Sequence, residues 1–482
     1  MDDINIVIKD NKTCKIESIN VDIINEISDL LSYKQTGSEY TQAYKLGAWD
    51  GRVRLLTNKN EFKIGLLTKV KQYLDLNKIN YNLLDNRKNN KTYNKYNLKN
   101  IGLVPRDYQI RCVDAAKENE IGIIRASVGA GKTYVAALLA AEFNKPTIIY
   151  VIGLDLLQQF HDLFSKLFDE EIGWIGNGIC KPKRITIASV WTLGSALKMK
   201  KNIMSDEDEY IKELPPSTQD KIKIQKCMKE AAIHIIDECH SCTCETLQQI
   251  YKLINPERLY GLSGTPFRDD GSDLLTEAML GQIIVNVSCS ELIERKILAQ
   301  PVIKFVNTPK YSTSLKTYQE IYKEFIVNNE IRNALIVKNT KTLIEKKYKP
   351  LVLFKTIEHG QNLYKLFLEN NIRCELLYGN DSLEKRNEIK DKLNNDEIDC
   401  IIASTIFDIG LDLPKLSALV LAGSGKSRVR IIQRIGRVIR GFQGKARAAI
   451  VDFMDNVKML DKHSIIRYET YLSEPGFKIL GK

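Results

Sequence analysis

The sequence lacks any uninterrupted apolar run near the ~20 residues that a helix needs to cross a bilayer. Its first ten residues, MDDINIVIKD, are acidic and alternate between apolar and polar side chains. Neither a signal peptide nor a transit peptide has that composition. We therefore expect a cytoplasmic protein without a membrane segment.

Histidine is scarce, with five residues in 482, and the ten cysteines are spread along the whole chain. Scattered cysteines form no disulfide framework in a chain of this size, and they fit a reducing compartment. Cys239, His240, Cys242 and Cys244 do lie within six positions. Zinc sites usually combine two ligand clusters that are distant in sequence, so free thiols are expected here rather than a metal site.

What the chain has in excess is positive charge. The net charge is +11, and residues 45–100 contain 13 Lys and Arg against 4 Asp and Glu, a surplus of 9. Trp49 and several tyrosines lie within this stretch, a mixture that suits nucleic acid. A lysine-rich, solvated surface would have the same composition, so charge alone leaves both interpretations open.

The length of 482 residues is typical of two to four domains. Residues 1–103 show the patterns of a small α+β domain, with an alternating strand near Ile4–Ile8 and helices near residues 24–31 and 66–76. Two further blocks follow, 104–308 and 309–482, in which short apolar runs alternate with helical patterns. Each block therefore predicts a parallel sheet covered by helices. The charged segment 198–226 interrupts the first block and predicts a surface excursion.

The segment Ala126-Ser127-Val128-Gly129-Ala130-Gly131-Lys132-Thr133 lies between an apolar run, 121–124, and a helical stretch. Strand, glycine loop and helix is the arrangement of a phosphate-binding loop, in which Gly129 and Gly131 allow backbone N–H groups to face phosphate oxygens. Lys132 would reach the β- and γ-phosphates, and the Thr133 hydroxyl would bind Mg²⁺.

Two acids follow the apolar run Ile233–Ile236. Carboxylates at the carboxyl end of a strand face the ligand crevice of an open α/β sheet. Asp237 is expected to hold Mg²⁺, and Glu238 to orient and deprotonate the attacking water. Ser263-Gly264-Thr265-Pro266 follows another strand, and its hydroxyls are expected to contact this pair, although an ordinary turn has the same sequence.

About 20 residues before the loop stands Arg106-Asp107-Tyr108-Gln109. The Gln109 amide carries both a donor and an acceptor and can read an adenine edge, while Arg106 can stack on the base or bond to it. A solvated helix start would look the same in isolation.

The second block has no glycine loop, but it carries Gln433-Arg434-Ile435-Gly436-Arg437-Val438-Ile439-Arg440. Arg437 and Arg440 share a face if this segment is helical, and two guanidinium groups suit the charge on a transferred phosphoryl group. A basic surface helix is the alternative. After the run Cys400–Ala403, Thr405 is a candidate for a nucleic-acid phosphate, and Asp412 for coupling ATP to the nucleic acid, unless this is only a polar loop.

In order, the six segments R-D-Y-Q, A-S-V-G-A-G-K-T, D-E-C-H, S-G-T-P, S-T-I-F-D-I-G-L-D and Q-R-I-G-R-V-I-R resemble the motif series of superfamily 2 helicases. The form of D-E-C-H and S-G-T-P is similar to that of the DNA translocase branch. Residues 44–56, YKLGAWDGRVRLL, resemble the amino-terminal domain of the phage UvsW-type branch-migration helicases.

This resemblance implies two tandem RecA-like domains, 104–308 and 309–482, behind a DNA-binding domain at 1–103. It implies an ATP- and Mg²⁺-dependent DNA helicase that regresses forks, migrates Holliday junctions and unwinds branched duplexes. A monomer in the host-cell cytoplasm is expected. The resemblance also adds candidate residues: Gln433 for catalysis, Gly410 and Asp412 for nucleotide binding, and Trp49, Arg52 and Arg54 for DNA binding.

Three alternatives stay open at this point. The motifs also fit an RNA or RNA–DNA hybrid helicase, and a restriction-type translocase on double-stranded DNA. A non-enzymatic binder with a degenerate ATP site is disfavoured, because Lys132, Asp237, Glu238 and both motif arginines are present.

Overall fold

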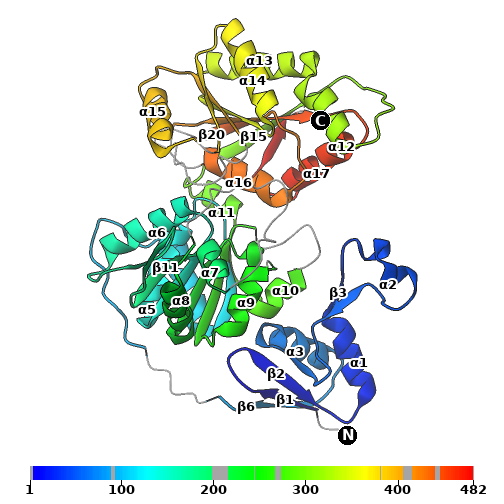
Figure 1. Ribbon diagram of the computed structural model, residues 1–482, viewed down its shortest axis with the longest axis vertical. Coiled ribbons are helices and arrows are strands. Elements are labelled where there is room, and N and C mark those ends of the chain that lie inside the picture. Colours follow the sequence, from blue (N-terminus) through cyan, green and yellow to red (C-terminus); the bar gives the residue numbers. More distant parts are fainter. Residues whose placement is uncertain are drawn as a thin grey trace. The chain divides into compact units, whose positions relative to one another are not determined.

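A computed structural model describes residues 4–87, 93–197, 215–243, 245–265, 273–379, 381–404, 415–439 and 446–480 (Figure 1). These residues form two compact units. Apart from loop residues 127–130, the first covers the chain up to Val287 and the second begins at Ser288. Each unit is described by itself.

The first unit opens with a small α+β domain built on a four-stranded sheet in the order β5-β2-β1-β6. Strand β1 pairs antiparallel with β2 and parallel with β6. A two-stranded arm, β3 with β4, carries the short helices η1 and α2. The elements are β1 (Ile4–Ile8), β2 (Thr13–Glu17), α1 (Val21–Leu30), β3 (Ser32–Lys34), η1 (Ser38–Tyr40), α2 (Gln42–Lys45), β4 (Arg52–Arg54), β5 (Glu61–Lys63), η2 (Ile64–Leu66), α3 (Leu67–Leu76) and β6 (Tyr81–Asp85).

An eight-stranded sheet follows in the same unit, in the order β10-β9-β11-β8-β12-β13-β7-β14. All its pairs are parallel except that of β10 with β9, and its central strands are buried on both faces, as their continuous apolar runs predict. The strands are β7 (Ile121–Ala126), β8 (Thr147–Val151), β9 (Gly173–Gly176), β10 (Ile179–Lys181), β11 (Ile185–Ser189), β12 (Ile233–Asp237), β13 (Arg258–Ser263) and β14 (Ile283–Val287).

Along the chain, helices alternate with these strands, in the pattern of a doubly wound sheet (Figure 1). They are α4 (Asp107–Glu118), α5 (Lys132–Phe143), α6 (Leu154–Leu167), α7 (Val190–Ala196), α8 (Thr218–Glu230), η3 (Cys239–Thr243), α9 (Glu245–Leu253) and α10 (Asp273–Leu280).

The second unit contains a parallel seven-stranded sheet in the order β17-β18-β16-β19-β20-β15-β21. Its strands are β15 (Gln300–Asn307), β16 (Pro350–Phe354), β17 (Cys374–Leu377), β18 (Cys400–Ser404), β19 (Ala418–Leu421), β20 (Arg447–Met454) and β21 (Lys478–Leu480). Its helical segments are α11 (Cys289–Glu294), α12 (Tyr318–Tyr322), η4 (Lys323–Val327), α13 (Glu330–Glu345), α14 (Ile357–Glu369), α15 (Leu383–Asn394), α16 (Arg428–Val438) and α17 (Leu460–Leu472).

The predicted class, two tandem parallel-sheet domains behind a small α+β domain, is confirmed. Two local expectations differ from the structure. The surface excursion expected over 198–226 is wrong at its end, since α8 begins at Thr218 and buries Ile224 and Met228 one turn apart. Strand β15 pairs with β20 of the second sheet, although it precedes the predicted boundary at 308/309.

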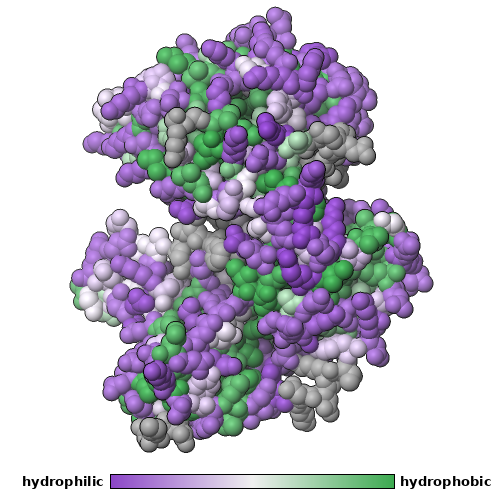
Figure 2. Space-filling model, turned by 180° about the vertical axis from the view of Figure 1, so that it is seen from behind, coloured by the Kyte–Doolittle hydropathy of each residue, from purple (hydrophilic) through white to green (hydrophobic). Residues whose placement is uncertain are grey.

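No described helix is long and apolar enough to cross a membrane. Seen from behind, hydrophilic residues cover much of the surface, and hydrophobic residues lie in separate patches between them (Figure 2).

Candidate active site and nucleic-acid contacts

The predicted phosphate loop connects β7 to α5. Gly129 and Gly131 adopt φ angles of +84° and +79°, in the left-handed region that glycine enters without steric cost. Helix α5 begins at Lys132, so Lys132 and Thr133 occupy its first turn. The N–H groups of a first turn have no carbonyl one turn earlier and can face an anion.

The side chain of Gln109 lies against this loop. A Cβ atom at Gly131 would be 2.7 Å from Gln109 Nε2, so the Gln109 amide lies directly against the backbone of the loop. Gln109 is buried, and its Oε1 accepts a hydrogen bond of 3.0 Å from the backbone N–H of Arg106. Arg106 is exposed, and its guanidinium donates to the Tyr108 hydroxyl over 2.9 Å. The structure thus brings the R-D-Y-Q segment to the loop that it precedes.

Strand β12 delivers the two acids to the same edge of the sheet. Asp237 is its last residue and is buried. Glu238 follows at φ +48°, a left-handed conformation that is strained for a residue with a side chain. One carboxylate oxygen of Glu238 lies 3.5 Å from Lys132 Nζ. The lysine of the loop and the predicted base therefore form a partly buried ion pair.

The other carboxylate oxygen of Glu238 contacts the S-G-T-P segment. Ser263 Oγ donates to it over 3.3 Å, and His240 Nδ1 lies 3.4 Å both from that oxygen and from Ser263 Oγ. The expected contact between this hydroxyl and the acidic pair is present for Ser263. Sequence reasoning gave His240 no role at this site, although its position two residues after Glu238 was the available signal.

The environments of the two acids push their pKa values apart. Burial and the Glu238 charge raise the pKa of Asp237 to about 7. Burial alone would also raise the pKa of Glu238, but the Lys132 ammonium and the contact with His240 outweigh it and lower that pKa. Two neighbouring carboxyls whose environments shift their pKa values in opposite directions are typical of sites that carry out acid–base chemistry.

The described residues fit a nucleotide with a divalent cation. Asp237 Oδ1 is buried, with no hydrogen-bond partner among the described residues. A buried carboxylate oxygen without a partner is costly, and a cation would compensate it. Carboxylate and hydroxyl oxygens, as in Asp237 and Thr133, are ligands that Mg²⁺ prefers.

In the second unit, α16 carries Gln433 and Arg437, both partly buried and one turn apart. The helix ends at Val438. Arg440, which was expected to share a helical face with Arg437, lies outside the described residues, as do Thr405, Gly410 and Asp412.

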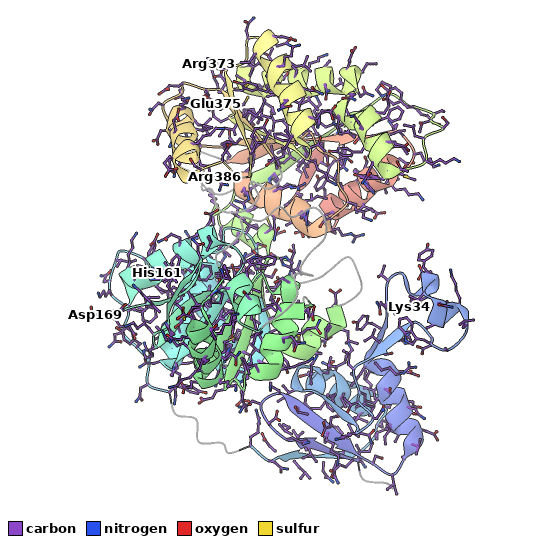
Figure 3. All side chains as sticks on the ribbon, in the orientation of Figure 1. Lys34, His161, Asp169, Arg373, Glu375 and Arg386 are labelled. Atoms are coloured by element: carbon purple, nitrogen blue, oxygen red, sulfur yellow. The ribbon has the colours of Figure 1, made fainter. Side chains whose placement is uncertain are left out.

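The candidate DNA-binding residues of the amino-terminal domain lie at β4 and just before it, on the arm whose residue Lys34 is marked in Figure 3. The partly buried Trp49 donates its indole N–H to the Arg52 carbonyl over 2.8 Å. Arg52 donates to Ser32 Oγ, and Arg54 lies 2.8 Å from Asp50 and 3.3 Å from Asp29. Both guanidinium groups thus have partners within the domain, and a phosphate would have to compete with them.

Part of the positive charge in residues 45–100 is compensated inside the first unit. Among the described residues, acidic side chains of the RecA-like part pair with four of these cations: Lys69 with Glu277, Arg87 with Glu120, Lys95 with Glu142, and Lys99 with Asp169. The composition therefore overstates the basic surface that nucleic acid would meet.

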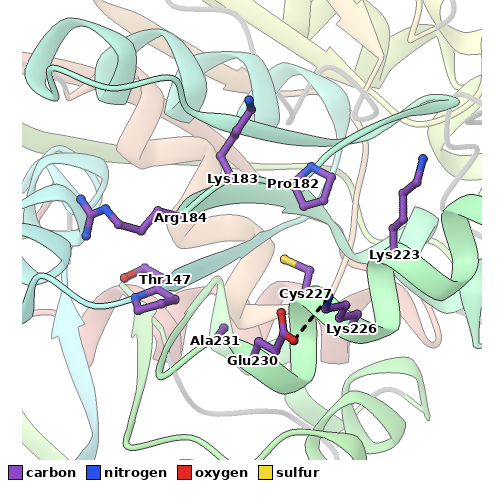
Figure 4. Close-up of a pocket in the computed structure, with 10 residues that line it drawn as sticks. Thr147, Pro182, Lys183, Arg184, Lys223, Lys226, Cys227, Glu230 and Ala231 are labelled. Atoms are coloured by element: carbon purple, nitrogen blue, oxygen red, sulfur yellow. Dashed lines mark ion pairs between the residues drawn. The ribbon is translucent and has the colours of Figure 1, made fainter.

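A cavity of about 430 Å³ lies at the amino ends of strands β8 and β11, at the opposite edge of the sheet from the acids (Figure 4). Four cationic side chains line it, and each has an acidic partner: Lys183 with Glu171, Arg184 with Glu170, Lys223 with Asp220, and Lys226 with Glu230. These ion pairs offset the positive charge of the lining cations, and a nucleotide phosphate would have to compete with the acidic partners.

Comparison with known proteins agrees with this geometry. Three family models match: "DNA helicase UvsW, N-terminal" over residues 3–84, "Type III restriction enzyme, res subunit" over 102–268, and "Helicase conserved C-terminal domain" over 316–441. The chain is a superfamily 2 helicase of the UvsW-like kind. It is an ATP-dependent enzyme that acts on DNA, as the motif series predicts.

Similar proteins include the ATP-dependent DNA helicase uvsW of Enterobacteria phage T4, 26% identical over 93% of this chain and 93% of that protein. The DNA 3'-5' translocase XPB2 of Sulfurisphaera tokodaii is 28% identical over 70% of this chain and 78% of its own length. The DNA-bound Type ISP restriction-modification enzyme LlaBIII shares the fold, with a TM-score of 0.54 at 13% identity, over 77% of this chain and 30% of that one.

Proposed function

We propose that this helicase uses ATP hydrolysis to remodel branched DNA, by regressing forks, migrating Holliday junctions and unwinding branched duplexes in replication, recombination and repair. The observation that carries the proposal is the match of residues 3–84 to the UvsW amino-terminal model, joined to an intact Lys132, Asp237 and Glu238 cluster. The name of the phage T4 relative, an ATP-dependent DNA helicase, supports the same class.

In the proposed cycle, Lys132 exchanges its contact with Glu238 for the β- and γ-phosphates of ATP. Glu238, relieved of its cation, then orients the attacking water and accepts its proton. Asp237 and Thr133 would hold Mg²⁺, which supplies positive charge to the phosphate oxygens when it is bound. Gln109 and Arg106 recognise the adenine.

Ser263 is proposed to report the state of the phosphates, because it touches the same Glu238 oxygen as His240 does. The roles of Gln433, Arg437 and Arg440 in stabilising the transferred phosphoryl group, of Gly410 and Asp412 at the nucleotide, and of Thr405 at a DNA phosphate are proposals drawn from the motif resemblance.

DNA is proposed to meet the arm of the amino-terminal domain. Tyr40 and Leu46 are 77% and 73% exposed there, and Lys34 lies 5.7 Å from the centre of the Tyr44 ring. Exposed aromatic and cationic side chains are the groups that stack on bases and contact phosphates without reading sequence. Since Arg52 and Arg54 have internal partners, we propose that they contribute only when DNA displaces those partners.

The test compares ATP-dependent turnover, for the full chain, of a mobile Holliday junction, a model fork, a linear DNA duplex, an RNA duplex and an RNA–DNA hybrid. Lys132→Ala is the control, because it should bind DNA but turn nothing over. The proposal expects the junction and the fork to be processed fastest. Equal rates on the linear DNA duplex would favour a restriction-type translocase, and preference for the RNA substrates would favour an RNA or hybrid helicase; either outcome would contradict branched-DNA action.

A further inference from the structure

The amino-terminal domain holds the end of helix α9. Lys12 Nζ donates to the carbonyl oxygens of Tyr251 and Lys252 over 3.1 and 2.9 Å, in the last turn of that helix. The carbonyls of a last turn lack helical partners and carry partial negative charge, so a cation there stabilises the helix end. The Tyr251 hydroxyl returns a hydrogen bond of 3.4 Å to the Lys12 carbonyl.

The backbone of the same domain also packs closely against helix α10. An atom added as Cβ at Gly65 would lie 2.5 Å from the Ala278 carbonyl oxygen, so η2 and α10 touch without an intervening side chain. Ala278 is fully buried and belongs to the hydrophobic core of the amino-terminal domain, together with Leu66 and Val70. The two parts therefore share one core and are more than tethered neighbours.

Helices α9 and α10 flank η3, which directly follows Glu238. Helix α9 continues the chain after η3, and α10 packs against η3. The packing is tight at Gly261 of β13, where an added Cβ would lie 2.8 Å from Cys239 Cβ and 2.6 Å from Leu280 Cδ1. Cys239 is thus fixed between β13 and the end of α10, immediately after the strained backbone of Glu238.

We infer that the amino-terminal domain positions the catalytic segment for ATP hydrolysis, with Lys12 and Gly65 as positioning residues. They hold α9 and α10, which in turn hold the left-handed turn that aims Glu238. The inference rests on the proposed role of Glu238. It gives the domain a part in ATP turnover besides its proposed part in binding DNA.

The experiment measures steady-state ATP hydrolysis by full-length Lys12→Met, which keeps the aliphatic stem but cannot donate to the two carbonyls. A small displacement of a catalytic group costs turnover more than nucleotide affinity, so kcat should fall about 10-fold while KM for ATP stays within about twofold. Lys12→Arg can still donate to both carbonyls and should recover most of the kcat. Lys15→Met is the matched control, because Lys15 lies three residues further along, on β2, and its ammonium pairs with Glu17 of the same strand at 2.8 Å.

Gly65→Ala provides an independent test, because its methyl group must push η2 away from α10. It should show the same fall in kcat at unchanged KM. Ile6→Val, which removes one methylene group from β1 in the amino-terminal core and leaves Lys12 and Gly65 in place, should keep the wild-type kcat at a temperature where all variants are folded.

The inference is overturned if Lys12→Met and Gly65→Ala keep the wild-type kcat. It is also overturned if the control variants Lys15→Met and Ile6→Val lose as much kcat as Lys12→Met and Gly65→Ala. Glu238→Gln, assayed in parallel, separates this failure from failure of the proposed function. If Glu238→Gln is inactive while Lys12→Met is normal, Glu238 keeps its role and only the positioning by the amino-terminal domain is disproved.

Discussion

Lys132 Nζ lies 3.5 Å from a carboxylate oxygen of Glu238, so the cation of the phosphate loop is paired with the predicted base. The same carboxylate accepts from Ser263 on its other oxygen. Phosphate oxygens would compete for Lys132, and the outcome of that competition decides when Glu238 can act as a base.

Glu238→Gln should retain ATP binding and lose turnover by at least ~100-fold, the usual contribution of a positioned general base. The amide keeps the size of the side chain but cannot accept the proton of water. Nucleotide affinity by calorimetry and single-turnover hydrolysis should be measured separately. Hydrolysis at the wild-type rate would remove Glu238 from the proposed role.

Gly131→Ala should abolish nucleotide binding while the protein stays folded. The added methyl group would meet Gln109 Nε2 at 2.7 Å, and the φ of +79° is unfavourable for alanine. Gly102 serves as the control, because it has a similar φ of +80° and open space around its Cβ position. Binding of a fluorescent ATP analogue should be lost in Gly131→Ala and kept in Gly102→Ala; equal binding by both would show that the close approach to Gln109 is dispensable.

Without nucleotide, the free energy of unfolding should depend on pH through the protonation of Asp237. Burial and the neighbouring Glu238 raise its pKa from 3.8 to about 7, so between those values the folded state holds a proton that the unfolded state releases. This contribution is fully present below about pH 4 and is lost as the pH rises through 7.

Denaturant titrations of wild type and Asp237→Asn between pH 5 and pH 8 check this prediction. The difference in unfolding free energy, wild type minus variant, should fall as the pH rises, because only the wild type loses the proton. A difference that is constant across the range would show that the pKa of Asp237 is not raised.

The sequence was sufficient to predict the elements that hold the ATP cluster. Buried parallel strands such as β8 and β12 are continuous apolar runs, and the glycine loop identifies the turn between β7 and α5. These signals are local, which is why the positions of Lys132, Asp237 and Glu238 followed from them.

The remaining features depend on partners far away in the chain. Strand β15 joins the second sheet because its partner is β20, about 150 residues later, and nothing in residues 300–307 specifies that choice. In the sequence, Lys12 has no feature that distinguishes it from a surface lysine. Its role depends on the end of α9, about 240 residues away in the chain, which it contacts in the fold. The strained φ of Glu238 is likewise found beside the close approach of Cys239 to Gly261, a residue of another strand that no local pattern around Glu238 identifies.

Arg437→Ala should lower DNA-stimulated ATP turnover by ~10³-fold or more if it acts as an arginine finger. Arg437 is partly buried on α16, one turn after Gln433. Arg428 begins the same helix, is 54% exposed and lies 3.7 Å from Glu469, so Arg428→Ala removes the same charge at an exposed position.

ATP affinity in the absence of DNA should change little in either variant, because the phosphate loop belongs to the other RecA-like domain. The decisive measurement is kcat with saturating junction DNA, which should collapse only in Arg437→Ala. A loss of about twofold in both variants would identify α16 as a basic surface helix.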